Sequence, residues 1–190
     1  MKTAAEVLAI SRAVDGQGTE DHANCTCTGL ELALLIERVM ALPVGSRIVE
    51  IGVFTGRSAS VYLQLQEQLQ LDIHLIDNWS WNERYAVPYF AQMVLDKYNE
   101  VPFTLHKRRS DRPWPWGLPI HLLYVDGWHD MPGIDADCRI WLPRVVPGGL
   151  VAFHDSQSPD VASCIEKYVK AAGYAQLGEC ERITIWRKPL

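Results

Sequence analysis

The sequence predicts an α/β fold in which helices cover both faces of a mostly parallel sheet. Short apolar runs rich in β-branched residues alternate with longer segments of helical periodicity, which is typical of parallel strands joined by crossover helices. The run 120–126 is apolar almost throughout, as expected of a strand that is covered on both faces. With 190 residues, the chain is long enough for one domain with a full core. We divide this domain into an N-terminal helical extension, 1–45, and a core, 46–190.

The expected strands and helices follow from this alternation in chain order. Strands are predicted at 47–53, 72–77, 101–107, 120–126, 150–153 and 181–186. Helices are predicted at 29–40, 58–69, 84–98, 134–142 and 159–172. The helix 58–69, for example, repeats apolar residues at Ala59, Tyr62 and Leu65, the spacing of one helix face. Three prolines between 113 and 119 exclude a regular crossover helix before the fourth strand, and Pro147-Gly148-Gly149 predicts a turn before the fifth.

The charge of the chain argues against a nucleic acid as its partner. The formal net charge is -5, with 48% hydrophobic and 22% charged residues, whereas tracking a polyanion needs clustered Lys and Arg. The nearest basic cluster, Lys107-Arg108-Arg109, is followed at once by Asp111, and we interpret it as a solvated strand end. We therefore expect a small-molecule substrate, and the sequence leaves a homo-oligomer open.

Cysteine content and hydropathy indicate a reducing compartment. No segment of the sequence reaches the roughly 20 apolar residues of a membrane span, and residues 1–14 do not resemble a signal peptide. The five cysteines are an odd number without zinc-type pairs, so we expect no disulfide framework and a cytoplasmic location. Cys25 and Cys27 form a C-x-C pair that either binds a metal or is structural.

Four carboxylates end or follow apolar strands, namely Glu50, Asp77, Asp126 and Asp155. A single acid at a strand end is commonly a helix cap or a turn former. Four of them on four strands are more than capping explains. Because ligands of open α/β sheets bind at the carboxyl ends of the strands, these acids predict a binding site at that edge.

The loop after the first strand indicates the kind of ligand. Gly52 and Gly56 stand four residues apart between a strand and a helix, and glycines there allow a ligand to approach the backbone closely. The spacing G-x-x-x-G differs from the G-x-G-x-x-G of dinucleotide-binding loops. Glu50 precedes the first glycine, where a carboxylate would repel a pyrophosphate and suit an ammonium group. The alternative is an ordinary tight turn.

Asp77 ends the second strand, at a place where an acid accepts the two hydroxyls of a ribose. The alternative is an N-cap to a following turn. Together with the glycine loop, Asp77 predicts an adenosine-containing ligand without a diphosphate.

Several motifs resemble those of known enzymes. The segment 49–58 resembles the first motif of class I S-adenosylmethionine-dependent methyltransferases. The later motifs are similar to one subgroup, the sugar O-methyltransferases of macrolide and aminocoumarin biosynthesis together with cephalosporin-hydroxylase-like proteins. These motifs are Val125-Asp126-Gly127-Trp128-His129, Asp135, Asp137, Trp141-Leu142-Pro143, Pro147-Gly148-Gly149 and Phe153-His154-Asp155. The resemblance implies a Rossmann-like three-layer sandwich with a mostly parallel seven-stranded sheet whose last strand, 181–186 here, is antiparallel.

The resemblance also implies a role for each matching residue toward S-adenosylmethionine. Glu50 and Gly52 would lie near the methionine end, with Gly56 in the same loop and Ser58 at the helix start. Asp77 would hold the ribose. The implied adenine contacts are Asn78, Trp79, Ser110 and Asp111. Asp126 would lie between the sulfonium and the methyl acceptor.

In metal-dependent relatives, the resemblance places a magnesium ion at Asp126 and at acids after the fifth strand. Here the second position is His154-Asp155. Mg²⁺ prefers oxygen ligands, so His154 either weakens the site or suits another divalent ion. His129 matches a histidine proposed as general base in this subgroup, and a histidine can accept a hydroxyl proton near neutral pH. The alternative is that His129 holds Asp126 in place.

Aromatic residues are dense after the second strand and after the third, at Trp79, Trp81, Tyr85, Tyr89, Phe90, Trp114 and Trp116. They would line an apolar or sugar acceptor pocket, or pack the helices and an oligomer interface. We expect Trp79 and Trp81 near the cofactor.

The sequence thus predicts an enzyme that transfers a methyl group from S-adenosylmethionine to a small molecule, with the hydroxyl oxygen of a sugar or another metabolite as the acceptor. One alternative is a noncatalytic domain that binds S-adenosylmethionine. Another is a Rossmann-like nicotinamide-dependent oxidoreductase, against which the missing G-x-G-x-x-G and Glu50 count.

Overall fold

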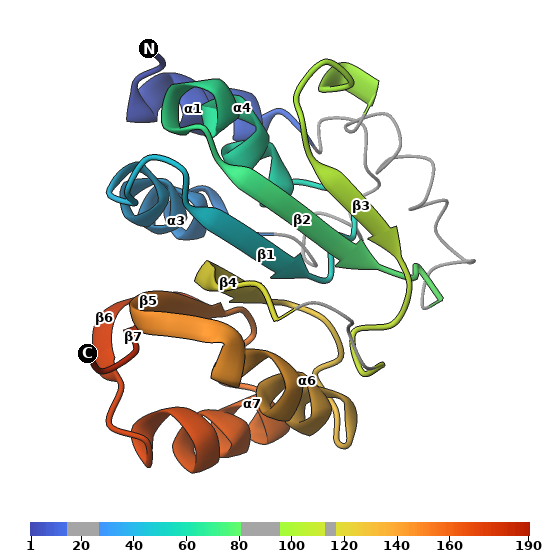
Figure 1. Cartoon of the computed structure of the whole chain (residues 1–190), viewed down its shortest axis with the longest axis vertical. Helices are drawn as coiled ribbons and strands as arrows, with labels where there is room; N and C mark the ends of the chain where they lie inside the picture. The colour runs from blue at the N-terminus through green and yellow to red at the C-terminus, as the bar shows by residue number, and fades with distance from the viewer. Residues whose placement is uncertain (15–26, 81–95, 113–116) are drawn as a thin grey trace.

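The computed structural model describes residues 1–14, 27–80, 96–112 and 117–190. Within these residues seven strands form one sheet in the order β3-β2-β1-β4-β5-β7-β6 (Figure 1). The strands are β1 (Arg47–Ile51), β2 (Asp72–Asp77), β3 (Thr104–Lys107), β4 (Ile120–Val125), β5 (Val145–Phe153), β6 (Ala175–Cys180) and β7 (Ile183–Arg187). β7 runs antiparallel to β5 and β6, whereas β1 to β5 pair in parallel. The predicted mostly parallel sheet with an antiparallel last strand is confirmed.

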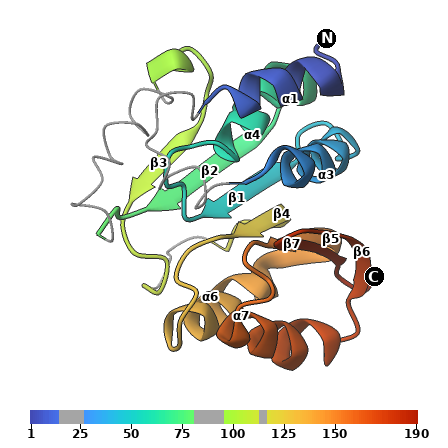
Figure 2. The same ribbon diagram turned by 180° about the vertical axis from the view of Figure 1, so that it is seen from behind.

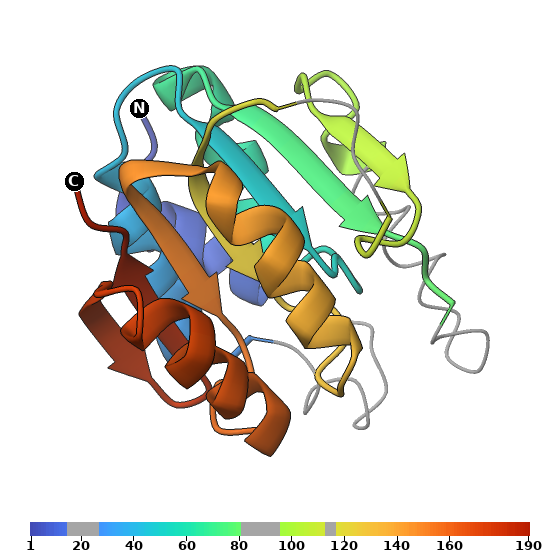
Figure 3. The same cartoon turned by 60° about the horizontal axis from the view of Figure 1, so that its bottom comes forward.

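Helices cover both faces of this sheet. The helices α1 (Ala4–Arg12), α3 (Gly29–Met40) and α4 (Ala59–Leu69) lie on one side, and α6 (Gly133–Trp141) and α7 (Pro159–Cys164) lie on the other (Figures 1 and 2). Figure 3 shows α6 and α7 in front of the strands. The Rossmann-like three-layer sandwich is therefore confirmed.

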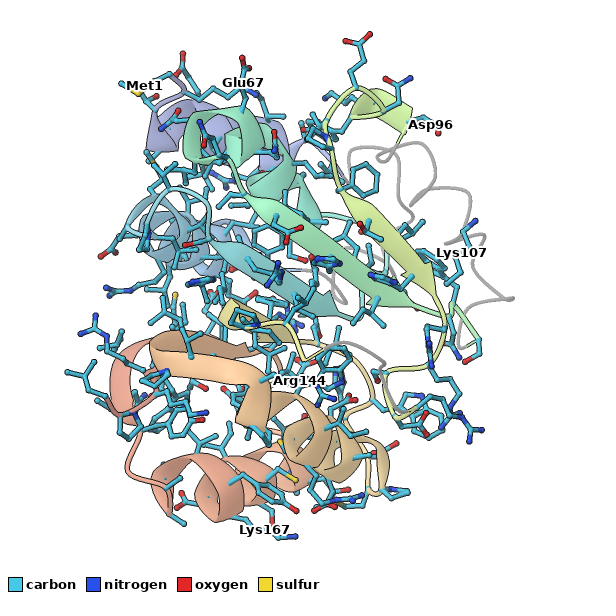
Figure 4. The ribbon with its side chains drawn as sticks, viewed as in Figure 1. Met1, Glu67, Asp96, Lys107, Arg144 and Lys167 are labelled. Atoms are coloured by element: carbon cyan, nitrogen blue, oxygen red, sulfur yellow. The ribbon has the colours of Figure 1, made fainter. Side chains whose placement is uncertain are left out.

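The alternation of side chains along each strand builds a separate core on each face. On β1, Ile48 packs with Leu35 of α3 and Leu65 of α4 in one buried cluster. The next residue, Val49, packs with Trp141 of α6 in the other cluster. Each cluster removes large aliphatic and aromatic side chains from water, at about 25 cal/mol for each Å² of apolar surface. Charged side chains such as Glu67 of α4 are exposed and point outward in Figure 4.

The boundaries of most predicted elements agree with the structure within a few residues. The helix 29–40 and the strand 72–77 have the predicted bounds. The helix 159–172 is α7, followed by a π-helical segment, η2 (Ile165–Lys170). The third strand begins at Thr104, after Pro102, because proline supplies no N–H to a ladder. Most of the predicted helix 84–98 lies outside the described residues.

In the last third of the chain, one sequence prediction is wrong, one strand has shifted bounds and one strand was missed. Pro147-Gly148-Gly149 is not a turn before the strand but part of β5, as a bulge between the pairs Ile120–Val145 and Leu122–Leu150. The predicted final strand, 181–186, is confirmed as β7, but its bounds are Ile183–Arg187, because Glu181 has a φ of 50° and begins the hairpin turn. The edge strand β6 was not predicted. Its residues are exposed or half-buried, so an apolar strand pattern is missing.

The part of the chain that the structure describes contains no helix long and apolar enough to cross a membrane. The predicted basic cluster begins at Lys107, the last residue of β3, which is exposed at the edge of the sheet (Figure 4). This position agrees with a solvated strand end.

Candidate functional site

A cavity of about 470 Å³ opens at the carboxyl ends of the parallel strands. Its lining includes Asp77, the last residue of β2, and the residues that directly follow β1, β3 and β4, which are Gly52, Arg108 and Asp126. β1 lies between β2 and β4, so the strand order reverses here, and open α/β sheets bind ligands at such a point. The predicted site residues in the lining are Gly52, Asp77, Asn78, Trp79, Ser110, Asp111, Asp126 and His129.

Gly52 allows the backbones after β1 and β4 to meet at the base of the cavity. Its φ is 85°, and a Cβ atom built on it would lie 2.0 Å from the carbonyl oxygen of Asp126. The amide of Gly52 donates to the carbonyl of Ile76 at 2.9 Å. A side chain at this position would force β1 and β4 apart, so the residue type is dictated by space as well as by φ.

Asp77 fixes the glycine loop against the end of β2. Its Oδ2 accepts hydrogen bonds from the amides of Val53 (2.8 Å) and Phe54 (2.9 Å), and its Oδ1 accepts one from the amide of Trp79 (2.7 Å). The indole N–H of Trp79 donates to the carbonyl of Phe54 at 3.0 Å. Burial raises the pKa of Asp77, and the hydrogen bonds from the backbone oppose that rise. Asp77, which the sequence predicts to bind a ribose, therefore also holds the glycine loop in place.

Glu50, Gly56 and Ser58 are not among the residues that line the cavity. Glu50 is fully buried, and its Oε1 accepts a hydrogen bond from the Ser58 hydroxyl. Its Oε2 is buried without a hydrogen-bond partner among the described residues. Burial raises the pKa of Glu50 well above its usual value, because water no longer solvates the charged form. Glu50 and Ser58 thus lie beneath the loop that borders the cavity.

Two histidines join the acids after β4 and β5. His129 Nε2 lies 3.3 Å from Asp126 Oδ1, and His129 Nδ1 lies 3.2 Å from Asp155 Oδ2. His154 Nδ1 lies 3.1 Å from Asp126 Oδ1 and 3.6 Å from Asp155 Oδ2. Burial lowers the pKa of both histidines, but the carboxylates, Asp126 above all, outweigh it and raise both pKa values. The structure therefore brings together His129 and Asp126, predicted to be catalytic, with His154 and Asp155, predicted to share a metal ion with Asp126.

Two residues behind this cluster were missed by sequence reasoning. Glu31 of α3 is fully buried, and its Oε2 lies 3.3 Å from Nε2 of His154. The backbone amide of Arg182, in the turn between β6 and β7, donates to Glu31 Oε1 at 2.8 Å, and its guanidinium lies 3.6 Å from Asp155 Oδ1. Glu31 forms a capping box with Thr28, and this local motif was the signal in the sequence. It predicts a helix start but no link to a site.

Trp128 and Arg109 form a wall of the cavity that sequence reasoning also missed. The guanidinium of Arg109 lies 4.8 Å from the centroid of the Trp128 ring. Arg109 also donates two hydrogen bonds to Asp111, from Nε at 3.0 Å and from Nη2 at 2.6 Å. Trp128 remains 46% exposed, so part of its surface is available to a ligand. The other dense aromatic residues, Trp81, Tyr85, Tyr89, Phe90, Trp114 and Trp116, lie outside the described residues, as does Cys25.

Asp137 is a buried acid in the cavity lining, and the sequence pattern gave no role to its side chain. It lies on the buried face of α6 with Ile134, Cys138 and Trp141. Burial raises its pKa to about 7, and a hydrogen bond from Ser110 partly opposes the rise. In the folded protein Asp137 therefore holds its proton over a pH range in which the unfolded chain has lost it.

Asp137→Asn is expected to stabilise the protein increasingly as the pH rises. Because the pKa of the folded state is raised from 3.8 to about 7, the wild type loses stability between these two values. Each pKa unit corresponds to about 1.4 kcal/mol, so the full loss approaches roughly 4 kcal/mol above pH 7. Urea denaturation of both proteins at pH 5 and pH 8 measures this effect. If Asp137→Asn raised the free energy of unfolding equally at the two pH values, the raised pKa of Asp137 would be contradicted.

The sequence of this chain matches one family of known proteins and one curated relative. The family described as "Methyltransferase domain" matches residues 49–156. A curated relative, the uncharacterized protein y4gI of Sinorhizobium fredii (strain NBRC 101917 / NGR234), is 26% identical over 119 residues. These are 58% of this chain and 13% of the relative, so the chain spans a small part of that protein.

Solved structures share the fold. Apo CalS11, described as a TDP-rhamnose 3'-O-methyltransferase of calicheamicin biosynthesis, has a TM-score of 0.64 and 19% identity, over 96% of this chain and 93% of that chain. The S-adenosylhomocysteine-bound methyltransferase PaMTH1 of Podospora anserina has a TM-score of 0.67 and 14% identity, over 96% and 88%. The O-methyltransferase NovP has a TM-score of 0.61 and 14% identity, over 83% and 77%.

Proposed function

The chain belongs to the family of methyltransferase domains, and from this premise we propose that it transfers the methyl group of S-adenosylmethionine to a hydroxyl oxygen of a sugar or another small metabolite. The predicted resemblance to class I S-adenosylmethionine-dependent methyltransferases is confirmed at the level of family and fold. The observation that carries the activity is the cavity at the carboxyl ends of the strands, which unites Gly52, Asp77 and Asp126.

The residues of the cavity fit S-adenosylmethionine. Gly52 lines the cavity and carries no side chain, so a ligand can approach its backbone closely. Asp77 borders the cavity at the end of β2, where an acid accepts ribose hydroxyls. Asn78, Trp79, Ser110 and Asp111 line the same cavity, and we assign them to the adenine end. Glu50, whose Oε2 is buried without a partner among the described residues, supports the loop from below.

We assign two tasks to the chain's own residues, which are to orient the methyl acceptor and to accept its proton. S-adenosylmethionine, when bound, supplies a methyl group on a sulfonium that a hydroxyl oxygen can attack. Asp126 and His129 line the cavity, and we assign acceptor orientation to Asp126 and proton acceptance to His129. The His129 side chain is 38% exposed, so an acceptor can reach its ring. Holding the reactants in line supplies most of the acceleration in such a displacement.

The wall formed by Trp128 and Arg109 supports a ring-shaped acceptor with hydroxyl groups. An indole presents a broad apolar face that packs against sugar or aromatic rings. Arg109 is bonded to Asp111 and lies over the same indole, so these contacts orient both side chains of the wall. His129 directly follows Trp128 in the chain, which brings a proton acceptor next to a ring packed there.

Titration calorimetry with S-adenosylhomocysteine and with NAD tests this proposal. We expect S-adenosylhomocysteine to bind at least about tenfold more tightly than NAD, a difference of roughly 1.4 kcal/mol or more. The physical reason is that the G-x-x-x-G loop follows the buried Glu50, and this loop lacks the pattern that wraps a pyrophosphate. NAD binding of equal or greater strength would favour an oxidoreductase. Binding of S-adenosylhomocysteine without turnover of any hydroxylated acceptor would favour a noncatalytic binding domain.

A further inference from the structure

We propose that Glu31 orients His154 so that Asp126, His154 and Asp155 bind a divalent transition-metal ion that accepts nitrogen ligands, in preference to Mg²⁺. The proposal rests on the proposed function for the place of the ion beside the acceptor. Ion binding itself can be measured without any methyl acceptor.

The donor atoms of these three residues are spaced like ligands of one ion. His154 Nδ1 lies 3.1 Å from Asp126 Oδ1 and 3.6 Å from Asp155 Oδ2. One donor atom from each of the three residues lies within 4.8 Å of the other two. Two atoms that each lie about 2.1 Å from an ion are roughly 3 to 3.5 Å apart. The three side chains could therefore close on one ion with small movements.

Glu31 supplies the support that a metal-binding histidine needs. A histidine that binds a metal through one ring nitrogen commonly donates its other N–H to a carboxylate, which sets the tautomer and the ring orientation. Glu31 Oε2 lies 3.3 Å from His154 Nε2. Glu31 is itself held by the amides of Thr28 (2.7 Å) and Arg182 (2.8 Å). With its Nε2–H directed at Glu31, His154 directs Nδ1 toward the two aspartates, and an ion bound there takes the place of the Nδ1 proton.

The donor set selects the ion. Mg²⁺ is a hard cation that takes oxygen ligands and keeps several waters. An imidazole suits Zn²⁺ better, and the affinity of such a mixed nitrogen and oxygen site rises from Mn²⁺ to Co²⁺. The side chain of His154 is fully buried and cannot turn away to let water take its place. The site therefore offers one imidazole nitrogen beside the carboxylate oxygens of Asp126 and Asp155.

The ion is expected on the side of His154 that faces the cavity. The side chains of Asp126 and Asp155 are 18% and 22% exposed, so an ion can reach them. On the opposite side of the ring, Cys27, Glu31 and His154 also lie close enough to share an ion. That side is fully buried, and the Cys27 thiol is paired with the Tyr124 hydroxyl at 3.0 Å. Glu31 already accepts two backbone amides there.

Titration of the metal-free full chain with Mn²⁺, Co²⁺, Zn²⁺ and Mg²⁺ in turn tests the proposal. We expect Co²⁺ and Zn²⁺ to bind at least about tenfold more tightly than Mg²⁺, and Mn²⁺ to bind more weakly than either. Glu31→Gln should weaken Co²⁺ binding by about 10- to 100-fold. Glu37→Gln, on the same helix with a 65% exposed side chain, is the matched control and should leave binding unchanged. His154→Asp, where it folds, should shift the preference toward Mg²⁺.

Four results would overturn the proposal. Absence of ion binding would leave His154 as a buried link between Glu31 and Asp126. Equal binding of Mg²⁺ would remove the role of the imidazole, and unchanged Co²⁺ binding in Glu31→Gln would remove that of Glu31. Loss of Co²⁺ binding in Cys27→Ser would place the ion on the buried side. Titration of the same samples with S-adenosylhomocysteine separates these results from failure of the proposed function, because that ligand can bind without an ion.

Discussion

Replacing Asp77 by alanine is expected to abolish measurable binding of S-adenosylhomocysteine. The carboxylate borders the cavity and accepts hydrogen bonds from the amides of Val53, Phe54 and Trp79. Its removal takes away the acceptor assigned to the ribose and also the carboxylate that these three amides bind. Hydrogen bonds to a charged group contribute about 1.5 to 3 kcal/mol each. Losing the two bonds that we assign to the ribose hydroxyls therefore weakens binding by at least roughly 100-fold. Calorimetric titration of wild type and variant measures the change.

Two further variants separate the charge of Asp77 from its support of the loop. Asp77→Asn keeps one carbonyl oxygen for the loop amides, and we expect it to fold normally but still to bind at least about tenfold more weakly. Asp72→Asn, at the other end of the same strand, is the matched control. Its side chain is 44% exposed and pairs with Arg47 at 2.7 Å, and such surface pairs contribute about 0 to 1 kcal/mol. Wild-type affinity in Asp77→Asn would contradict the ribose assignment.

Gly52→Ala is expected to destabilise the protein by roughly 2 to 5 kcal/mol, the sum of a conformational cost and a steric one. The φ of 85° alone costs an alanine about 1 to 2 kcal/mol. The new Cβ would also lie 2.0 Å from the carbonyl oxygen of Asp126, and relieving such an overlap costs roughly another 1 to 3 kcal/mol. The total is a large part of the roughly 5 to 15 kcal/mol by which domains are typically stable. Urea denaturation measures the free energy of unfolding.

Gly45→Ala is the matched control for this change. Gly45 has a φ of 82°, and a Cβ there would meet no atom within 4 Å. We expect this variant to lose only the conformational cost, about 1 to 2 kcal/mol. The difference between the two variants then isolates the contact between the ends of β1 and β4. Equal losses would show that this contact is looser than the structure places it.

Residues that follow strands were predictable from the sequence because topology alone brings them together. Parallel strands end at the same edge of a sheet, so an acid after each apolar run must lie near the others. Asp77 and Asp126 were found in this way, and both line the cavity. Glu50 followed the same pattern, but it belongs to β1 and is fully buried. Its position on the strand, not its residue type, decides whether it reaches the cavity.

Local patterns failed where a neighbouring strand decides the conformation. Pro147-Gly148-Gly149 has the composition of a turn, yet Val145 already pairs with Ile120 before it. The partner strand thus absorbs the three residues as a bulge. Strand β6 is an edge strand that is largely exposed, so it needs no apolar pattern. Its place in the sheet depends on pairing with β7, which the residues of β6 alone do not indicate.

By itself, the sequence determined the alternation of strands and helices, the glycine loop and the acids of the binding edge, because each depends on residues close together in the chain or on the common direction of parallel strands. Only the tertiary structure decided what surrounds those acids. Glu31 and His154 are 123 residues apart in the chain, and Glu31 and Arg182 are 151 apart. Such contacts form when separate elements pack, so no local pattern encodes them. The raised pKa of Asp137 likewise follows from its burial, which belongs to the folded chain and not to the residue.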